Sequence, residues 1–75
     1  MTANVDIQKY GALLAETLPA VIRDDTELSR LTEVANRLAT KGIKENGLSL
    51  EENRLLELVV KLIEDYESEH YPIED

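Results

Sequence analysis

The stretch that most constrains this chain is residues 48–73, LSLEENRLLELVVKLIEDYESEHYPI, which predicts one long helix. Ser49 followed three residues later by Glu52 is a capping box: the hydroxyl accepts the amide of the third helical residue, and the carboxylate accepts the cap amide. Pro72 cannot continue a helix and disfavours helical geometry in the residue before it. The sequence therefore predicts a helix over about 50–70, roughly 30 Å long.

The apolar side chains of this helix are spread too widely to be covered by one neighbour. At about 100° per residue they span roughly 200°, and one packed helix covers about half of that. They are Leu55, Leu56, Leu58, Val59, Val60, Leu62, Ile63 and Tyr66. The second neighbour can be the N-terminal helix, a second copy of the chain, or a different protein. We predict a homodimer, with all of these residues except Leu58 as candidates for a dimer or partner interface.

The residues before this helix predict a short helix and an extended connector. Over about 5–18, apolar residues recur at helical spacing, and Asn4 can cap the helix. Pro19 ends this helix, and Val21 and Ile22 are expected to pin the connector to the core.

A second helix is predicted over about 25–41. Asp24 with Glu27 is a cap signal at its start, and Gly42 is expected to stop it. The short loop that follows contains the turn signal Asn46-Gly47, so the second and third helices should be antiparallel neighbours. The predicted fold is a single all-α domain: a short N-terminal helix, an extended connector and an αα-hairpin with a long C-terminal helix.

Composition narrows the function classes. The chain has 75 residues, no Cys, no Trp and no Phe, so disulfides and thiolate metal sites are excluded. With few large rings to fill a small core, stability is expected to depend on association. Residues 1–9 do not resemble a signal peptide, and no apolar run is long enough to span a bilayer. We expect a cytoplasmic protein that does not enter membranes.

The charge is concentrated at one end of the sequence. The net charge is −8; residues 1–50 carry seven acids and six bases, and residues 51–75 carry nine acids and two bases. Such a chain repels phosphates, so no direct nucleic-acid binding is expected, and a basic partner suits it better. Solubility alone is the alternative explanation.

The acids near the end of the long helix are candidates for contact with that basic partner. Carboxylates in a last helical turn oppose the helix dipole, which a sequence selected only for helix stability would avoid. The candidates are Glu64, Asp65, Glu67 and Glu69, together with Tyr71 as an aromatic anchor. The alternatives are a solvated, fraying helix end and a Tyr71 that folds back onto the hairpin.

Catalysis and cofactors find little support. Glu67 and His70 form a Glu-x-x-His pair of the kind that di-iron bundles use, but the core glutamates that should join it are missing. His70 is the only histidine, and no Gly-rich phosphate loop is present. We therefore expect no enzyme, no cofactor and no metal site.

Two stretches, LPAVIRDDTELSRLTEVANRL at 18–38 and LSLEENRLLELVVKLIEDYESEHYPI at 48–73, resemble the N-terminal helical part of HigA-type antitoxins. The likeness lies in a P-x-x-I-R segment at Pro19–Arg23 and in a helix ending L-I-E-x-Y-E-x-x-H-x-P-I from Leu62. Such antitoxins are transcriptional regulators that neutralise a basic ribonuclease toxin. The resemblance implies an antitoxin-like module that binds a HigB-type toxin, dimerises, or does both. The family continues into a helix-turn-helix domain beyond the position of Asp75, so DNA binding is not carried over.

Overall fold

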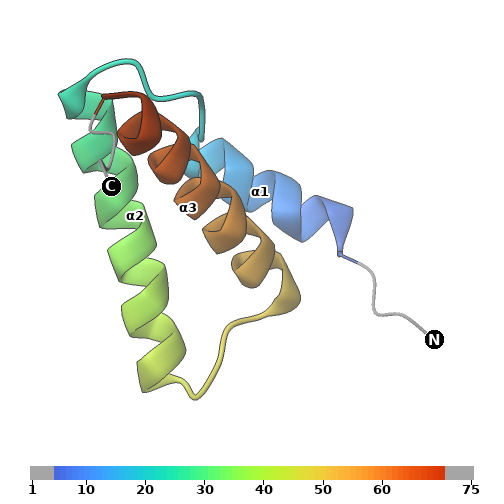
Figure 1. The fold of residues 1–75 in the computed structure, drawn as a ribbon. Helices are drawn as coiled ribbons and strands as arrows, with labels where there is room; N and C mark the ends of the chain where they lie inside the picture. The colour runs from blue at the N-terminus through green and yellow to red at the C-terminus, as the bar shows by residue number, and fades with distance from the viewer. Residues whose placement is uncertain (1–4, 71–75) are drawn as a thin grey trace.

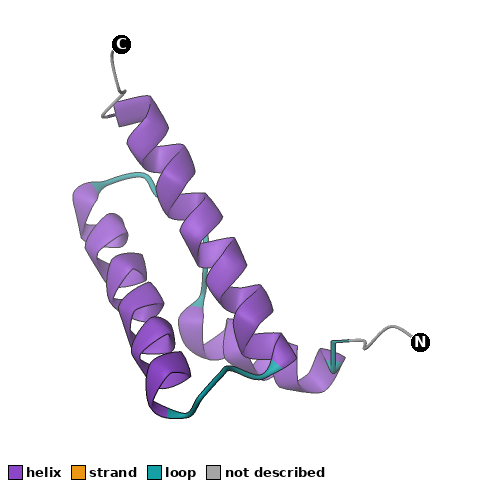
Figure 2. Ribbon diagram, turned by 60° about the horizontal axis from the view of Figure 1, so that its bottom comes forward, coloured by secondary structure: helices purple, strands orange, loops and turns teal. Residues whose placement is uncertain are grey.

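Three helices pack together in the computed structural model, which describes residues 5–70 (Figure 1). They are α1 (Ile7–Thr17), α2 (Asp25–Lys44) and α3 (Leu50–His70), and the described residues contain no strand. α2 and α3 form an antiparallel hairpin, and α1 packs against α3 (Figures 1 and 2). The all-α prediction is confirmed, with the connector at residues 18–24.

The start of α1 differs from the prediction. Asp6 is its N-cap, and the carboxylate Oδ1 accepts the amides of Gln8 at 3.0 Å and Lys9 at 3.2 Å. The expected cap, Asn4, lies outside the described residues. An aspartate directly before the first helical residue satisfies two free amides at once, so the helix begins at Ile7.

The end of α1 is fixed by a residue of α2. Leu18 adopts a left-handed conformation at φ 50°, and its amide bonds the Leu14 carbonyl at 2.7 Å. The Arg30 guanidinium then donates to the carbonyls of Thr17 at 2.6 Å and Leu18 at 2.9 Å. Because a helix C-terminus carries partial negative charge, this cation both caps α1 and ties it to α2.

Gly42 was expected to end the second helix, and this prediction is wrong: α2 continues to Lys44. A Cβ added at Gly42 would lie 3.2 Å from the Leu48 Cγ, so the glycine gives room for a close approach by the following loop. The chain reverses later, where Asn46 and Gly47 have φ of 62° and 132°. The predicted turn at Asn46-Gly47 is therefore confirmed, whereas Gly42 allows the loop to pack closely against α2.

Both predicted capping signals are present. Glu27 donates its amide to the Asp24 carboxylate at 2.8 Å. At the start of α3 the box is reciprocal: the Glu52 amide donates to the Ser49 hydroxyl at 3.1 Å, and the Ser49 amide donates to the Glu52 carboxylate at 3.0 Å. These local bonds set the first turns of the two hairpin helices.

The core lies where the hairpin, α1 and the connector meet. Its buried members are Ile22, Leu31, Val34, Leu55, Val59 and Tyr66. The connector is pinned by Ile22 alone, because Val21 is 69% exposed. The expectation that both residues reach the core is therefore wrong for Val21.

The wide apolar face of α3 has both of its neighbours within one chain. α2 covers one side, and Tyr10, Leu13 and Leu14 of α1 pack against the same core. Of the three neighbours that the sequence left open, the N-terminal helix takes the second place. Val60 remains 38% exposed on the outside of α3. No helix within residues 5–70 is long and apolar enough to cross a membrane.

The hairpin is also closed by an ion pair. The Lys41 ammonium of α2 contacts the Glu52 carboxylate of α3. The hydrogen bond between them raises the pKa of Lys41. The same bond, followed by the Ser49 amide, lowers the pKa of Glu52.

We predict that Leu55→Ala lowers the free energy of unfolding by about 2–5 kcal/mol, because Leu55 is 1% exposed and its loss leaves a cavity between all three helices. Chemical denaturation followed by circular dichroism measures the change. Ile43→Ala is the matched control, since Ile43 is 84% exposed. Equal effects of the two substitutions would contradict the assigned core.

The Lys41–Glu52 pair should make stability depend on pH at both extremes. Because the pKa of Glu52 is lowered in the fold, its contribution is present above the ordinary value of 4.5 and is lost as pH falls through the lowered pKa. Because the pKa of Lys41 is raised, its contribution is present below 10.5 and is lost as pH rises through the raised pKa. Lys41→Met should therefore lower Tm most between these values. A Tm difference that does not shrink in acid would refute the pair.

Candidate protein-binding site

Two groups of acids that lie far apart in the sequence meet at one end of the hairpin. Since α2 and α3 are antiparallel, the first turn of α2 lies beside the last turns of α3 (Figure 1). The Tyr66 hydroxyl joins the two ends by donating to the Asp25 carboxylate at 3.0 Å. We call this surface the acidic pole; its members are Asp24, Asp25, Glu27, Glu64, Asp65, Glu67 and Glu69.

The four acids predicted from the sequence, Glu64, Asp65, Glu67 and Glu69, are all exposed. Within residues 5–70, only Asp65 of these four forms an ion pair, with its Oδ1 3.5 Å from the Lys61 Nζ. The fifth predicted member, Tyr71, lies outside the described residues. The carboxylates of this group are therefore presented to solvent, where a second molecule can reach them.

The three acids of α2 were missed as members of the site. Asp24 and Glu27 were explained by capping, and in the structure the Asp24 carboxylate accepts the Glu27 amide while the Glu27 carboxylate accepts the Arg23 amide. The signal that could have found them is the hairpin itself, because an antiparallel pair places the start of one helix beside the end of the next. Their charges add to those of α3, so this end has a stronger negative potential than either helix has alone.

A groove runs beside the acidic pole, between the connector and α3. Its volume is about 350 Å³, and Val21, Leu62 and Tyr66 supply apolar lining. Asp65 and Glu69 also line it. A groove of this kind suits an apolar side chain that is flanked by basic residues, because the lining excludes water and the acids attract the cations.

His70 is engaged at the end of α3. Its ring stacks on Tyr66 with centroids 4.1 Å apart, and its Nδ1 lies 3.1 Å from the Tyr66 carbonyl oxygen. Residues 5–70 contain no group of three or more His, Asp or Glu side chains placed to hold a metal ion. Among these residues, Glu67 and His70 therefore have no further side chains beside them that would complete a metal site.

The apolar interface candidates are divided between three places. Leu55, Val59 and Tyr66 are buried within the protomer. Leu62 and Ile63 are half-buried and pack against that core, and Leu62 also lines the groove at the acidic pole. Leu56 and Val60 line a shallow depression on the outside of α3.

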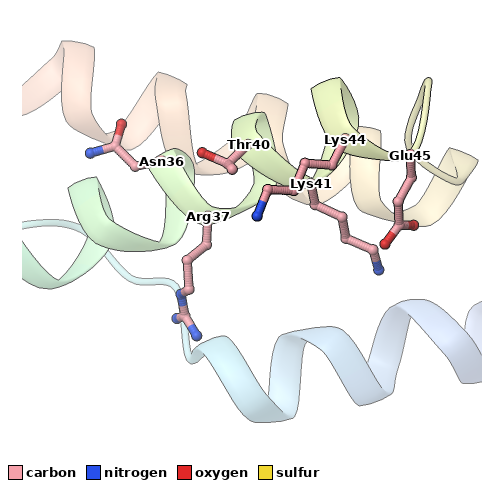
Figure 3. Close-up of a pocket in the computed structure, with 6 residues that line it drawn as sticks. All are labelled: Asn36, Arg37, Thr40, Lys41, Lys44 and Glu45. Carbon is pink, nitrogen blue, oxygen red and sulfur yellow. The ribbon is translucent and has the colours of Figure 1, made fainter.

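A basic surface lies toward the opposite end of α2, and the sequence analysis did not single it out. Arg37, Lys41 and Lys44 line a depression together with Asn36, Thr40 and Glu45 (Figure 3). Figure 3 shows Arg37 extending from α2 toward the end of α1. The spacing of three and four residues was the available signal, since it places these cations on one face of the helix.

Searches against protein-family models, curated proteins and solved structures give no match for this chain.

Glu67 and Glu69 should lower the free energy of unfolding. Removing charge with Glu67→Gln and Glu69→Gln should raise the free energy of unfolding by about 0.3–1 kcal/mol each, because both carboxylates lie in the last turns of a helix and oppose its dipole. Thermal unfolding at low salt measures the gain. Glu33→Gln, in the middle of α2, is the control and should change stability less. A loss of stability in the double variant would show that these acids support the fold.

Proposed function

We propose that this chain is an antitoxin-like protein-interaction module that binds and neutralises a basic ribonuclease toxin. The observation that carries the proposal is the acidic pole, where seven carboxylates lie at or near one end of the hairpin beside an apolar groove. The resemblance of residues 18–38 and 48–73 to HigA-type antitoxins supports the same conclusion.

Charge and apolar contact have separate tasks in such a complex. A ribonuclease must hold a polyanion, so its substrate surface carries cations. The acidic pole is complementary to that surface and would speed the encounter of the two proteins. The groove lined by Val21, Leu62 and Tyr66 would then accept an apolar side chain of the toxin and slow dissociation.

Neutralisation follows from competition for the same cations. Carboxylates that occupy the basic surface exclude RNA phosphates, and the bulk of α3 blocks access. This mechanism needs neither a nucleophile nor a metal in the module. It predicts that binding weakens as salt rises, because the exposed charges are screened over about 8 Å at physiological ionic strength.

A second hypothesis is that the chain forms a structural homodimer and has no toxin partner. The observation favouring it is the exposed Val60 beside Leu56 on the outside of α3. The two hypotheses predict different binding partners. A structural dimer would associate with itself and leave a neighbouring toxin unbound.

The deciding experiment is a pull-down with the protein encoded by the adjacent gene, followed by kinetic binding. We expect Glu67→Lys with Glu69→Lys to weaken binding by at least about tenfold, chiefly through slower association. Glu16→Lys with Glu33→Lys makes the same change in net charge at exposed positions away from the acidic pole, and should have a smaller effect. Binding that is unaltered by the first pair would remove the acids from the mechanism.

A further inference from the structure

The outer face of α3 is the one side of this helix that neither α1 nor α2 covers (Figures 1 and 2). It carries a shallow depression lined by Asn53, Leu56, Glu57, Val60, Lys61 and Glu64. Val60 is 38% exposed at its centre. This face shares no residue with the groove of the acidic pole, and Glu64 is the one member of the acidic pole that lines it.

Charged and apolar residues lie on different flanks of this face. At about 100° per residue, Leu56 and Val60 fall on one flank, whereas Arg54 and Lys61 fall on the other. These two are the only arginine and lysine residues of α3. Among residues 5–70 they form exposed ion pairs, Arg54 with Glu57 at 3.3 Å and Lys61 with Asp65 at 3.5 Å. Such pairs contribute little, so both cations can also serve an outside carboxylate.

We propose that a second copy of this chain binds this face, with the two α3 helices antiparallel and related by a two-fold axis close to residue 59. In that register the position numbers of facing residues add up to 118. Lys61 then faces Glu57 of the other copy, and Arg54 faces Glu64. Symmetry repeats both contacts, so each base on this face gains an acid.

The same symmetry matches the flanks. A two-fold axis perpendicular to the plane of the pair keeps each flank on the same side as the identical flank of the other copy. Leu56 of one copy therefore packs against Val60 of the other, Val60 lies beside its equivalent, and the charged residues meet charged residues. Charge disfavours parallel pairing. In a parallel pair Glu57, Lys61 and Glu64 would each face the identical residue of the other copy, so like charges would meet.

The antiparallel arrangement also separates the most strongly charged parts of the molecule. Each acidic pole lies at the C-terminal end of α3, so the two poles are at opposite ends of the dimer. Contact over residues 53–64 extends only about 17 Å. One helix pair of this length buries less than the roughly 800 Å² per partner of a standard interface, so the dimer forms at micromolar concentration or above.

Disulfide trapping tests the register, since the chain has no cysteine of its own. Two Val60→Cys chains would meet with a displacement of about 3 Å along the helix and should crosslink at least about tenfold faster than Ile43→Cys chains, which report random collision. Glu64→Cys chains lie about 15 Å apart along the helix and should not crosslink with each other. A mixture of Asn53→Cys and Glu64→Cys chains should give the mixed dimer.

Two outcomes would overturn the proposal. Rapid crosslinking of Glu64→Cys with itself would show parallel helices. A rate for Val60→Cys no higher than that for Ile43→Cys would show that the face is not paired. All four positions are exposed, and circular dichroism verifies that each variant keeps its helices.

Charge exchange provides a second measurement that does not use cysteine. Glu57→Lys and Lys61→Glu should each weaken self-association by at least about tenfold in sedimentation at high micromolar concentration, because like charges then face each other. Mixing the two variants should restore a dimer, since each new charge faces its opposite. Failure of the mixture to associate would refute the facing pair, whatever the result of the toxin pull-down.

Discussion

The structure depends on enclosing a helix that is apolar over more than half of its circumference. α3 presents Leu55, Val59 and Tyr66 to the interior, and one packed helix is too narrow to cover their flanks. The chain resolves this by placing α1 on the side that α2 leaves open. α1 has no fully buried residue of its own, so its position depends on contacts with the hairpin.

Those contacts are polar at both ends of α1 and apolar between them. Arg30 holds the C-terminal carbonyls, and the buried Glu51 accepts the Asp6 amide at 2.8 Å at the other end. A carboxylate at 8% exposure costs free energy unless it is hydrogen-bonded, so this bond both satisfies Glu51 and fixes the start of α1. A short helix with modest apolar area is thereby held in one orientation, which leaves the outer face of α3 and the acidic pole accessible.

The sequence predicts a structural feature well when the residues that determine it lie close together along the chain, and poorly when they lie far apart. The boxes at Asp24 and Ser49 were predicted because both partners lie within one turn. The role of Gly42 was not, because it depends on the return of Leu48 after the loop. Val21 and Ile22 are adjacent and equally apolar, so only the path of the connector decides that one is buried and the other exposed. Three of the seven acids of the acidic pole were not predicted for the same reason: they come close to the acids of α3 only when the hairpin closes.

The acids at the two helix ends of the acidic pole have different physical explanations, and only those at the end of α3 point to a partner. Asp24, Asp25 and Glu27 lie at the N-terminus of α2, where negative charge is favourable, and Asp24 caps the free amide of Glu27. Glu67 and Glu69 lie at the C-terminus of α3, where the dipole disfavours them, and the neighbouring end of α2 already has its own carboxylates. Folding alone therefore accounts for the acids of α2 and leaves Glu67 and Glu69 unexplained. A basic surface on another protein that reached this end of the hairpin would stabilise both sets together, because the antiparallel pair brings the two helix ends close to each other.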